Sequence, residues 1–146
     1  MKAIIYIFIS ISPLTFVYAA PVEKPKIQKD EFTVFFKEKY HVFKVLKYGK
    51  LKLSENCFKN INNNPKKRSS TPNCQAFDVA KIKVKDLALK KGAGTHPASL
   101  HCSRMMGENL IAYDHLNSEY DYCRFPDDSL VSSWSMFNNA YQGSKK

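Results

Sequence analysis

The stretch that decides the fold is His-Pro-Ala-Ser-Leu-His-Cys-Ser-Arg-Met-Met-Gly at residues 96–107. Thr95 or His96 can cap a helix here, and Pro97 fits its first turn, where a missing backbone N–H has no consequence. Gly107 is suited to the position where such a helix ends, because glycine readily adopts the left-handed conformation. The sequence therefore predicts one helix at the start of the C-terminal part.

A β-hairpin and a second helix are predicted to follow. Residues 110–113 and 120–125 have the apolar and aromatic composition of two short strands. Residues 126–129 form a tight Pro-Asp-Asp-Ser turn, and Ser132 or Ser133 can then begin the last helix. The C-terminal part is therefore expected to be a small α+β domain with the order helix, β-hairpin, helix.

The N-terminus has the three parts of a secretory signal peptide. Lys2 precedes an apolar run that ends in small residues before Pro21, and the best cleavage position follows Ala19. We expect residues 1–19 to be removed on export to the periplasm or the medium. A retained anchor is the alternative, but the run is short for a span of about 20 apolar residues and contains Pro13. No cysteine stands at the cleavage position, so a lipid anchor is not expected. No second long apolar stretch follows, so no transmembrane segment is expected after removal of the signal peptide.

All four cysteines lie in the mature part of the chain. An even number in a small exported protein is typical of disulfide bonding, and four cysteines allow three pairings. Sequence order favours Cys57–Cys74 and Cys102–Cys123, because each pair closes a loop of modest size. The second bridge would join the predicted helix to the second predicted strand, which a core this small needs. A zinc site is disfavoured, because the close cysteine pairs typical of zinc ligands are absent.

Basic residues concentrate in the first half of the mature chain. Residues 20–94 hold 18 Lys/Arg and 7 Asp/Glu, a net charge of +11, whereas residues 95–146 hold 4 and 6, a net charge of −2. Nucleic acid is not an expected partner outside the cytoplasm. The expected partner is an unknown protein or an anionic envelope surface. The alternative is that the lysines form only a solvated face.

The region at residues 20–94 is predicted to be partly helical. Between Asp30 and Gly49, large apolar side chains recur at three- and four-residue steps, as on one face of a helix. These side chains are Phe32, Phe36, Tyr40, Phe43 and Leu46. Such a helix is either an ordinary amphipathic helix packed on the core or a membrane-surface segment. The aromatic and β-branched content leaves a strand at Tyr40–Tyr48 as an alternative.

The rest of this region contains a short strand, a loop and an ambiguous segment. Residues 50–53 alternate between lysine and leucine, as a short strand does. Residues 60–73 have the Asn, Pro and Ser content of a loop. Residues 76–91 fit either a helix or a strand, and the glycines of 92–94 form the predicted boundary with the C-terminal domain at 95–146.

Residues 95–140 resemble a small bacterial domain family of unknown function whose members are often named haemolysins. The matching signature is His96-Pro97-Ala98-Ser99-Leu100-His101-Cys102, Gly107, Tyr120 to Ser129, and Trp134-Ser135-Met136-Phe137. The family pattern is close to Asn-Pro-Ala-Ser, an aromatic residue and Cys, then Phe-Pro-Asp-Gly-Ser after a second Cys, then Trp-Ala-Phe. Asp128 stands where the family has glycine, which is expected to reshape the turn. Val131 replaces the third cysteine of the family, and Tyr141 lies near the place of the missing fourth.

The resemblance implies that the two missing cysteines pair with each other in the family. It therefore implies that Cys102–Cys123 is the retained bridge and that Cys57–Cys74 is a separate bridge in the N-terminal part. It also implies a small exported or lipid-anchored envelope protein, and it carries no known catalytic residue.

No arrangement of side chains predicts catalysis, a cofactor or a metal. His96 and His101 are five residues apart, which misses the spacing that places two ligands on one helix face. The acidic side chains around the turns are most simply a solvated rim; they are Asp114, Glu119, Asp121, Asp127 and Asp128. We therefore expect a non-enzymatic module that binds a protein or an envelope component. The alternatives are a membrane-active, toxin-like protein that uses Phe32–Tyr48, and an inhibitor of exported peptidases.

Overall fold

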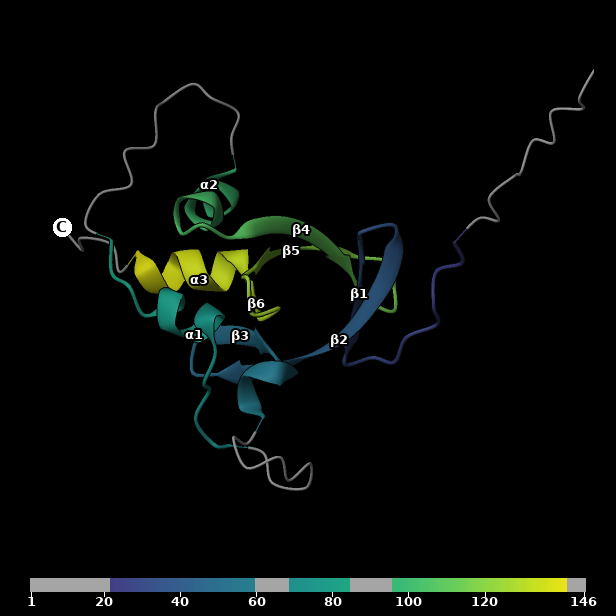
Figure 1. The fold of residues 1–146 in the computed structure, drawn as a ribbon, viewed down its shortest axis with the longest axis horizontal. Helices are drawn as coiled ribbons and strands as arrows, with labels where there is room; N and C mark the ends of the chain where they lie inside the picture. Colours follow the sequence, from purple (N-terminus) through teal and green to yellow (C-terminus); the bar gives the residue numbers. More distant parts are fainter. Residues whose placement is uncertain (1–21, 60–68, 85–95, 142–146) are drawn as a thin grey trace, which may run out of the picture.

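The computed structural model describes residues 22–59, 69–84 and 96–141. Six antiparallel strands form a closed barrel in the order β1–β2–β3–β6–β5–β4, and β4 pairs with β1 to close it (Figure 1). The strands are β1 (Glu31–Phe36), β2 (Lys39–Tyr48), β3 (Leu51–Ser54), β4 (Glu108–Tyr113), β5 (Glu119–Arg124) and β6 (Leu130–Ser132). The helices are the short 3-10 helix η1 (Glu55–Phe58), α1 (Gln75–Ala80), α2 (Pro97–Arg104) and α3 (Ser133–Ala140).

The fold class predicted from the sequence is wrong. The C-terminal part is not a separate helix–β-hairpin–helix domain of the α+β class, because β4, β5 and β6 form one half of the barrel wall. Val34 of β1 lies opposite Ala112 of β4, and Leu53 of β3 lies opposite Val131 of β6. A sheet of three strands has two edges with unpaired backbone groups, and the N-terminal strands satisfy both. The two parts of the chain therefore fold as one barrel.

The helix predicted between Asp30 and Gly49 is also wrong, because this segment is the β1–β2 hairpin. Lys37 and Glu38 both have positive φ, 49° and 61°, and form the two-residue turn that joins the strands. Such a turn matches the twist of a hairpin. The segment is rich in aromatic and β-branched residues, which pack well on a pleated sheet. The alternative strand at Tyr40–Tyr48 agrees closely with β2.

Individual elements of the C-terminal part lie where the sequence predicts them. Helix α2 has His96 as its N-cap and Pro97 in its first turn, and α3 follows Ser132. Strand β4 contains the first predicted strand, and β5 matches the second up to Arg124. In the N-terminal part, β3 matches the predicted short strand, and α1 occupies the start of the ambiguous segment. Local patterns therefore identified these elements but not their partners in the barrel.

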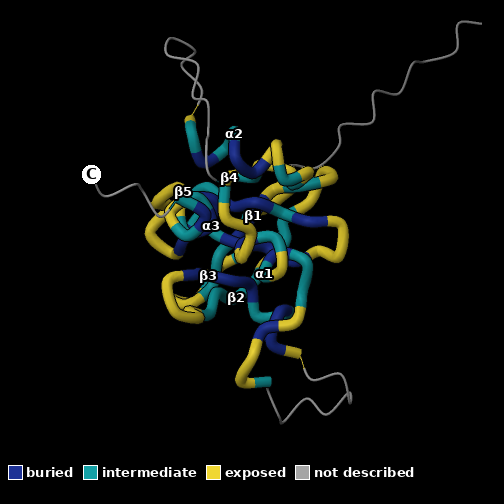
Figure 2. Tube along the Cα trace, turned by 90° about the vertical axis from the view of Figure 1, so that its left-hand side faces the viewer, coloured by how far each residue is buried: buried dark blue, intermediate teal, exposed yellow. Residues whose placement is uncertain are grey.

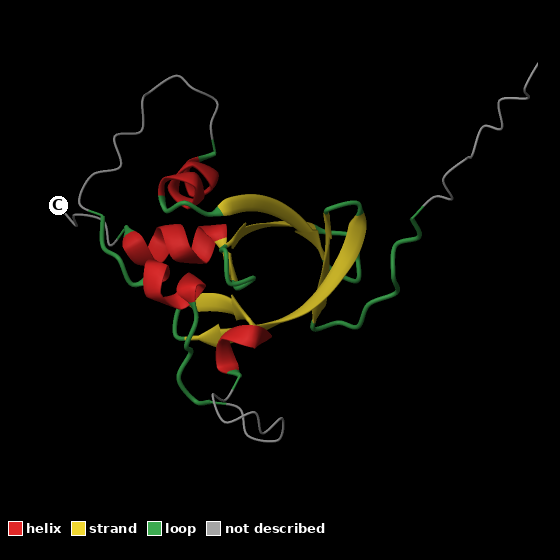
Figure 3. Cartoon of the chain, in the orientation of Figure 1, coloured by secondary structure: helices red, strands yellow, loops and turns green. Residues whose placement is uncertain are grey.

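The barrel wall separates two hydrophobic cores, because successive side chains of a strand point to opposite faces. Inside the barrel lie Phe32, Phe43, Val45, Leu110, Ala112, Tyr122 and Leu130. Between the barrel and the helices lie Leu51, Leu53, Cys57, Phe58, Ala76, Ala80, Cys102, Cys123, Phe125, Val131 and Met136. Helices α1, α2 and α3 gather on one side of the barrel, and the β1–β2 hairpin lies on the other (Figure 3). The buried segments lie centrally, and exposed segments lie mostly at the turns (Figure 2).

Some predictions fall on residues that the structure does not describe. They are the signal peptide at residues 1–19, residues 60–68 of the loop, residues 85–91 of the ambiguous segment and the glycine boundary at 92–94. In the described ranges, no helix has the length and apolar content needed to cross a bilayer.

Candidate binding surfaces

Both disulfide bonds lie on the side of the barrel that the helices cover. Cys57 of η1 is bonded to Cys74, directly before α1, at a sequence separation of 17 residues. Cys102 of α2 is bonded to Cys123 of β5 at a separation of 21 residues. This is the pairing that sequence order favours. Disulfide bonds are compatible with a location outside the cytoplasm. Here Cys102–Cys123 fixes α2 to the barrel, and Cys57–Cys74 joins η1 to the start of α1.

The turn between β5 and β6 holds α1 in place. The backbone N–H of Gln75 donates to the Asp127 carboxylate at 2.8 Å, and the N–H of Ala76 donates to Ser129 Oγ at 2.9 Å. Burial raises the pKa of Asp127, but the hydrogen bonds from Ser129 and Gln75 outweigh it and hold the pKa below its usual range. These contacts satisfy N–H groups in the first turn of α1. The residues of this turn therefore have a structural role.

Asp128 has a φ of 60°, the left-handed conformation that glycine adopts most easily. Its carboxylate pairs with Arg124, which also pairs with Glu108 at 3.1 Å. The Arg124 guanidinium lies 4.2 Å from the centroid of the Phe36 ring. The turn therefore keeps a glycine-like backbone, and the aspartate adds an ion pair at one end of the barrel.

The two histidines of the signature have different surroundings. His96 is exposed; its ring lies 4.6 Å from the Trp134 ring, and its Nε2 lies 3.8 Å from the Asp121 carboxylate. His101 is only 1% exposed and contacts Phe137. Neither ring nitrogen of His101 has a hydrogen-bond partner among the described residues. The two imidazoles do not converge on one point.

The acidic residues around the turns do not form one cluster. Asp114 begins the β4–β5 turn and accepts hydrogen bonds from the backbone N–H groups of Leu116 and Ser118 and from the Tyr120 hydroxyl, at 2.8, 2.9 and 3.2 Å. Burial raises the pKa of Asp114, but these hydrogen bonds outweigh it, so the pKa lies below its usual range. Asp127 lies in the β5–β6 turn, beyond the other end of β5. In the described part of the chain, no group of His, Cys, Asp and Glu could hold a metal ion.

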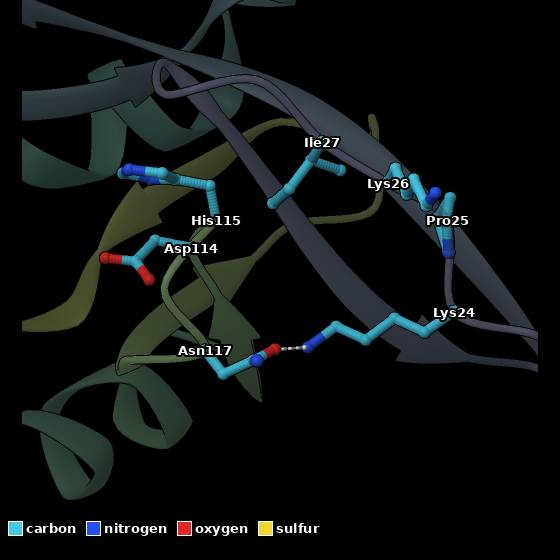
Figure 4. Close-up of a pocket in the computed structure, with 7 residues that line it drawn as sticks. All are labelled: Lys24, Pro25, Lys26, Ile27, Asp114, His115 and Asn117. Carbon is cyan, nitrogen blue, oxygen red and sulfur yellow. Dashed lines mark hydrogen bonds between the residues drawn. The ribbon is translucent and has the colours of Figure 1, made fainter.

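A shallow pocket of about 250 Å³ lies between the segment before β1 and the β4–β5 turn (Figure 4). Its lining consists of Lys24, Pro25, Lys26, Ile27, Asp114, His115 and Asn117. Lys24 Nζ donates to Asn117 Oδ1 at 2.6 Å and lies 4.4 Å from the centroid of the Tyr113 ring. The Asp114 carboxylate is occupied by its own turn. These contacts tie the N-terminal segment to the barrel and leave few polar groups directed at a ligand.

The β2–β3 hairpin carries the strongest candidate for an anion site. Lys47 of β2 lies directly opposite Lys52 of β3, and Lys50 lies in the turn between them. All three lysines are exposed, and none forms an ion pair with another described residue. Like charges that lie directly opposite each other destabilise a sheet. An anion bound between Lys47 and Lys52 would relieve this repulsion. We call these two residues the lysine pair.

The β1–β2 side of the barrel leaves a hydrophobic surface uncovered. Phe32 and Val34 point into the barrel, so Phe35 points outward. Phe35 and Ile111 are each 50% exposed, and Val42 is 47% exposed. We call the outward surface of β1, β2, β4 and β5 around these three side chains the open face.

No family model, curated protein or solved structure matches this chain. The sequence predicted the disulfide pairing of the four cysteines, but it predicted neither the lysine pair nor the open face. It predicted a helix between Asp30 and Gly49, in which Lys47 would not lie opposite Lys52. The strand alternative at Tyr40–Tyr48 was the one signal that could have shown Lys47 facing the alternating lysines of the next strand.

Proposed function

We propose that this chain is an exported, non-enzymatic module that binds an anionic, phosphate-bearing component of the bacterial envelope. The lysine pair is the observation that carries the proposal. Two ammonium groups on facing strands repel each other, and each has three N–H donors for oxygen acceptors. A phosphate group placed between them satisfies both charges, so binding replaces a repulsion with two attractions.

The distribution of charge around the barrel supports this partner. The described residues between 22 and 84 contain 12 lysines and 6 acidic residues, a net charge of +6. Residues 96–141 contain 2 arginines and 6 acidic residues, a net charge of −4. Because β1, β2 and β3 are neighbours in the barrel, the basic half forms one continuous arc of its wall. Such a field attracts anions to the arc that contains the lysine pair.

Export to the periplasm or the medium is part of the same proposal. The signal-like residues 1–19, with cleavage after Ala19, and the two disulfide bonds support it. The resemblance of residues 95–140 to the envelope domain described above points to the same compartment. Non-reducing peptide mapping of protein recovered from culture fractions tests it. We expect a chain that begins at Ala20 in an extracytoplasmic fraction, and a chain that retains residues 1–19 in the cytoplasm would contradict export.

Co-sedimentation with phospholipid vesicles tests the binding. The mature protein is expected to sediment with phosphatidylglycerol vesicles and not with phosphatidylcholine vesicles. Each lysine near an anionic surface contributes about 1 kcal/mol, so the double variant Lys47→Gln/Lys52→Gln should bind about 30-fold more weakly. Binding should also fall as salt is raised.

A matched control separates the lysine pair from net charge. Lys26→Gln/Lys29→Gln removes the same charge from exposed lysines before β1 and should change the affinity much less. Equal losses in the two variants would contradict a site at the lysine pair.

Competition by soluble polyphosphate separates two sources of the phosphate. If polyphosphate displaces the vesicles, the phosphate group itself is recognised; if it does not, a lipid surface is required. Release of a vesicle dye would instead favour a membrane-active protein.

A further inference from the structure

Helices α2 and α3 lie side by side on the covered side of the barrel, but each is attached to a different part of the molecule (Figure 1). Helix α3 is joined to β3 and α1. The backbone N–H of Lys52 donates to Ser135 Oγ at 3.2 Å, and the Asn139 side chain donates to the Ala80 carbonyl oxygen at 2.7 Å. These bonds hold α3 to the N-terminal half of the chain.

Helix α2 is attached to β4 and β5 instead. The Asn109 side chain of β4 donates to the Ser99 carbonyl oxygen at 3.1 Å and to Ser103 Oγ at 2.8 Å, and the Cys102–Cys123 bridge joins α2 to β5. Among the described residues, no hydrogen bond or ion pair joins α2 to α3. The two helices can therefore separate without the loss of a hydrogen bond or a disulfide bond that anchors either of them.

The interface between α2 and α3 contains the buried ring of His101. This residue is 1% exposed, and its ring centroid lies 6.2 Å from that of Phe137 of α3. Neither ring nitrogen has a hydrogen-bond partner in the described part of the chain. A protonated imidazole has two N–H donors and a positive charge, and burial of a charge without a partner is costly. The closed interface therefore favours the neutral ring.

The elements packed against α2 supply no negative charge to His101. Helix α3 has no ionisable side chain, and Tyr141 directly after it stacks on Phe137. On the outward face of β4 and β5, which α2 covers, the ionisable side chains are Tyr113, Glu119 and Asp121. Glu119 lies opposite Tyr113, and Asp121 lies beside His96. The other ionisable side chains of these strands point to the inside of the barrel and are Glu108, Tyr120, Tyr122 and Arg124.

The nearest charge on α2 itself also opposes protonation. Burial lowers the pKa of His101, and the positive charge of Arg104, three residues later, lowers it further. Once α2 leaves α3, the ring reaches water and its pKa returns toward the ordinary value of about 6.5. A proton therefore binds the separated state more tightly than the closed state.

We propose that the α2–α3 interface is a pH-sensitive switch, in which a proton on His101 separates α2 from α3 at mildly acidic pH. The barrel and both disulfide bonds stay intact, and the separation exposes Phe137. Below about pH 6.5, the ratio of separated to closed molecules should rise about tenfold for each pH unit, because one proton is taken up. The Cys102–Cys123 bridge keeps α2 attached to β5, so α2 can return when the pH rises. The switch is separate from the lysine pair and goes beyond the proposed function.

The ¹H–¹⁵N spectrum of the mature, disulfide-bonded protein, followed from about pH 7.5 to 5, tests the proposal. An isolated helix of eight residues is unstable in water, so the amides of α2 should move toward unfolded positions on separation. The amides of β1 and β2 should keep their dispersed positions. The imidazole signals of His101 should follow the same pH curve as the amides of α2, with a midpoint below about 6.5.

Two variants identify the titrating group. His101→Phe keeps a ring against Phe137 and should hold α2 closed at pH 5. The matched control His96→Gln removes the exposed histidine at the start of α2 and should leave the pH response within about twofold of the original. Thermal unfolding at pH 7.5 shows whether each variant is folded, and the imidazole titration of the unaltered protein does not depend on either.

Three results would overturn the proposal. The first is an α2 whose amides do not change down to pH 5. The second is a loss of dispersion in the whole spectrum at one pH, which would mean that the barrel unfolds with α2. The third is a response that survives in His101→Phe or disappears in His96→Gln.

Discussion

The two sides of the barrel differ in what covers the sheet. On the helix side, Leu53, Val131 and Met136 are fully buried, Cys102–Cys123 ties α2 to the wall, and Cys57–Cys74 ties η1 to the start of α1. On the hairpin side, Phe35, Val42 and Ile111 remain about half exposed. The difference teaches that stabilising contacts concentrate on one side, which leaves the strands of the other side free to present a binding surface.

Removal of a disulfide bond should give the largest difference between the sides. The variant Cys102→Ala/Cys123→Ala releases a loop of 21 residues between two fully buried positions. We expect it to lower the free energy of unfolding by about 3 kcal/mol. On the hairpin side, Phe35→Ala should lower it by no more than about 0.5 kcal/mol. Urea unfolding measures both, and losses of similar size would remove the proposed distinction.

Gly107 offers a second test of the helix side. A Cβ at this position would lie 2.9 Å from Cys102 Sγ and even closer to Cys123 Sγ. Gly107→Ala should therefore cost about 1–3 kcal/mol or prevent the bridge, which thiol titration would reveal. Gly49→Asn is the control. Gly49 has no atom within 4 Å of a Cβ, and asparagine tolerates its φ of 57°. Normal stability of Gly107→Ala with an intact bridge would contradict the crowding.

Lowering the pH should reduce the free energy of unfolding, because His101 on the helix side is buried in the folded protein. Burial lowers the pKa of His101, and the charge of Arg104 lowers it further. The unfolded chain therefore binds more protons as the pH falls below about 6.5, and the free energy of unfolding falls with it. His101→Phe should remove this slope and should raise stability at acidic pH. Unfolding between about pH 7.5 and 5 measures the effect. An unchanged slope in the variant would show that His101 is not its source.

The smallest effect on stability should come from the lysine pair. Lys47→Gln/Lys52→Gln removes a like-charge pair and should raise the free energy of unfolding by about 0.2–0.5 kcal/mol. The gain should disappear in high salt, because exposed charges are screened. Chemical denaturation at two salt concentrations measures it. A loss of stability would mean that the lysines support the fold rather than a ligand.

The sequence predicted elements better than their arrangement. Pro97 marks the start of α2, because capping preferences act within a few residues. The predicted end at Gly107 is wrong, because the helix ends at Arg104 and Met106, not Gly107, adopts the left-handed conformation. The β1–β2 turn at Lys37–Glu38 contains no glycine, asparagine or proline, so its position is not visible in the sequence. Pairing of β1 with β4 joins residues about 80 apart in the chain, and no local pattern encodes such a contact.

The candidate surfaces depend on that arrangement. Lys47 and Lys52 form a pair only because a tight turn at Gly49 sets the register of β2 and β3. Phe35 and Ile111 come together only when the barrel closes. The disulfide pairing could be predicted from the sequence, because the even number and the order of the cysteines favour local loops. Burial of His101 likewise depends on the packing of α2 against α3.

The central claim is that anions bind at the lysine pair and not at the helix side. A titration of the ¹⁵N-labelled mature protein with soluble polyphosphate, followed by amide chemical shifts, tests it most directly. We predict that the largest shifts occur at Lys47, Lys50 and Lys52, while the amides of α2 are unchanged. A smaller shift is expected at Ser135 of α3, because its hydroxyl accepts from the Lys52 amide at 3.2 Å. Largest shifts in α2 and α3, or the same shifts in Lys47→Gln/Lys52→Gln, would contradict the account.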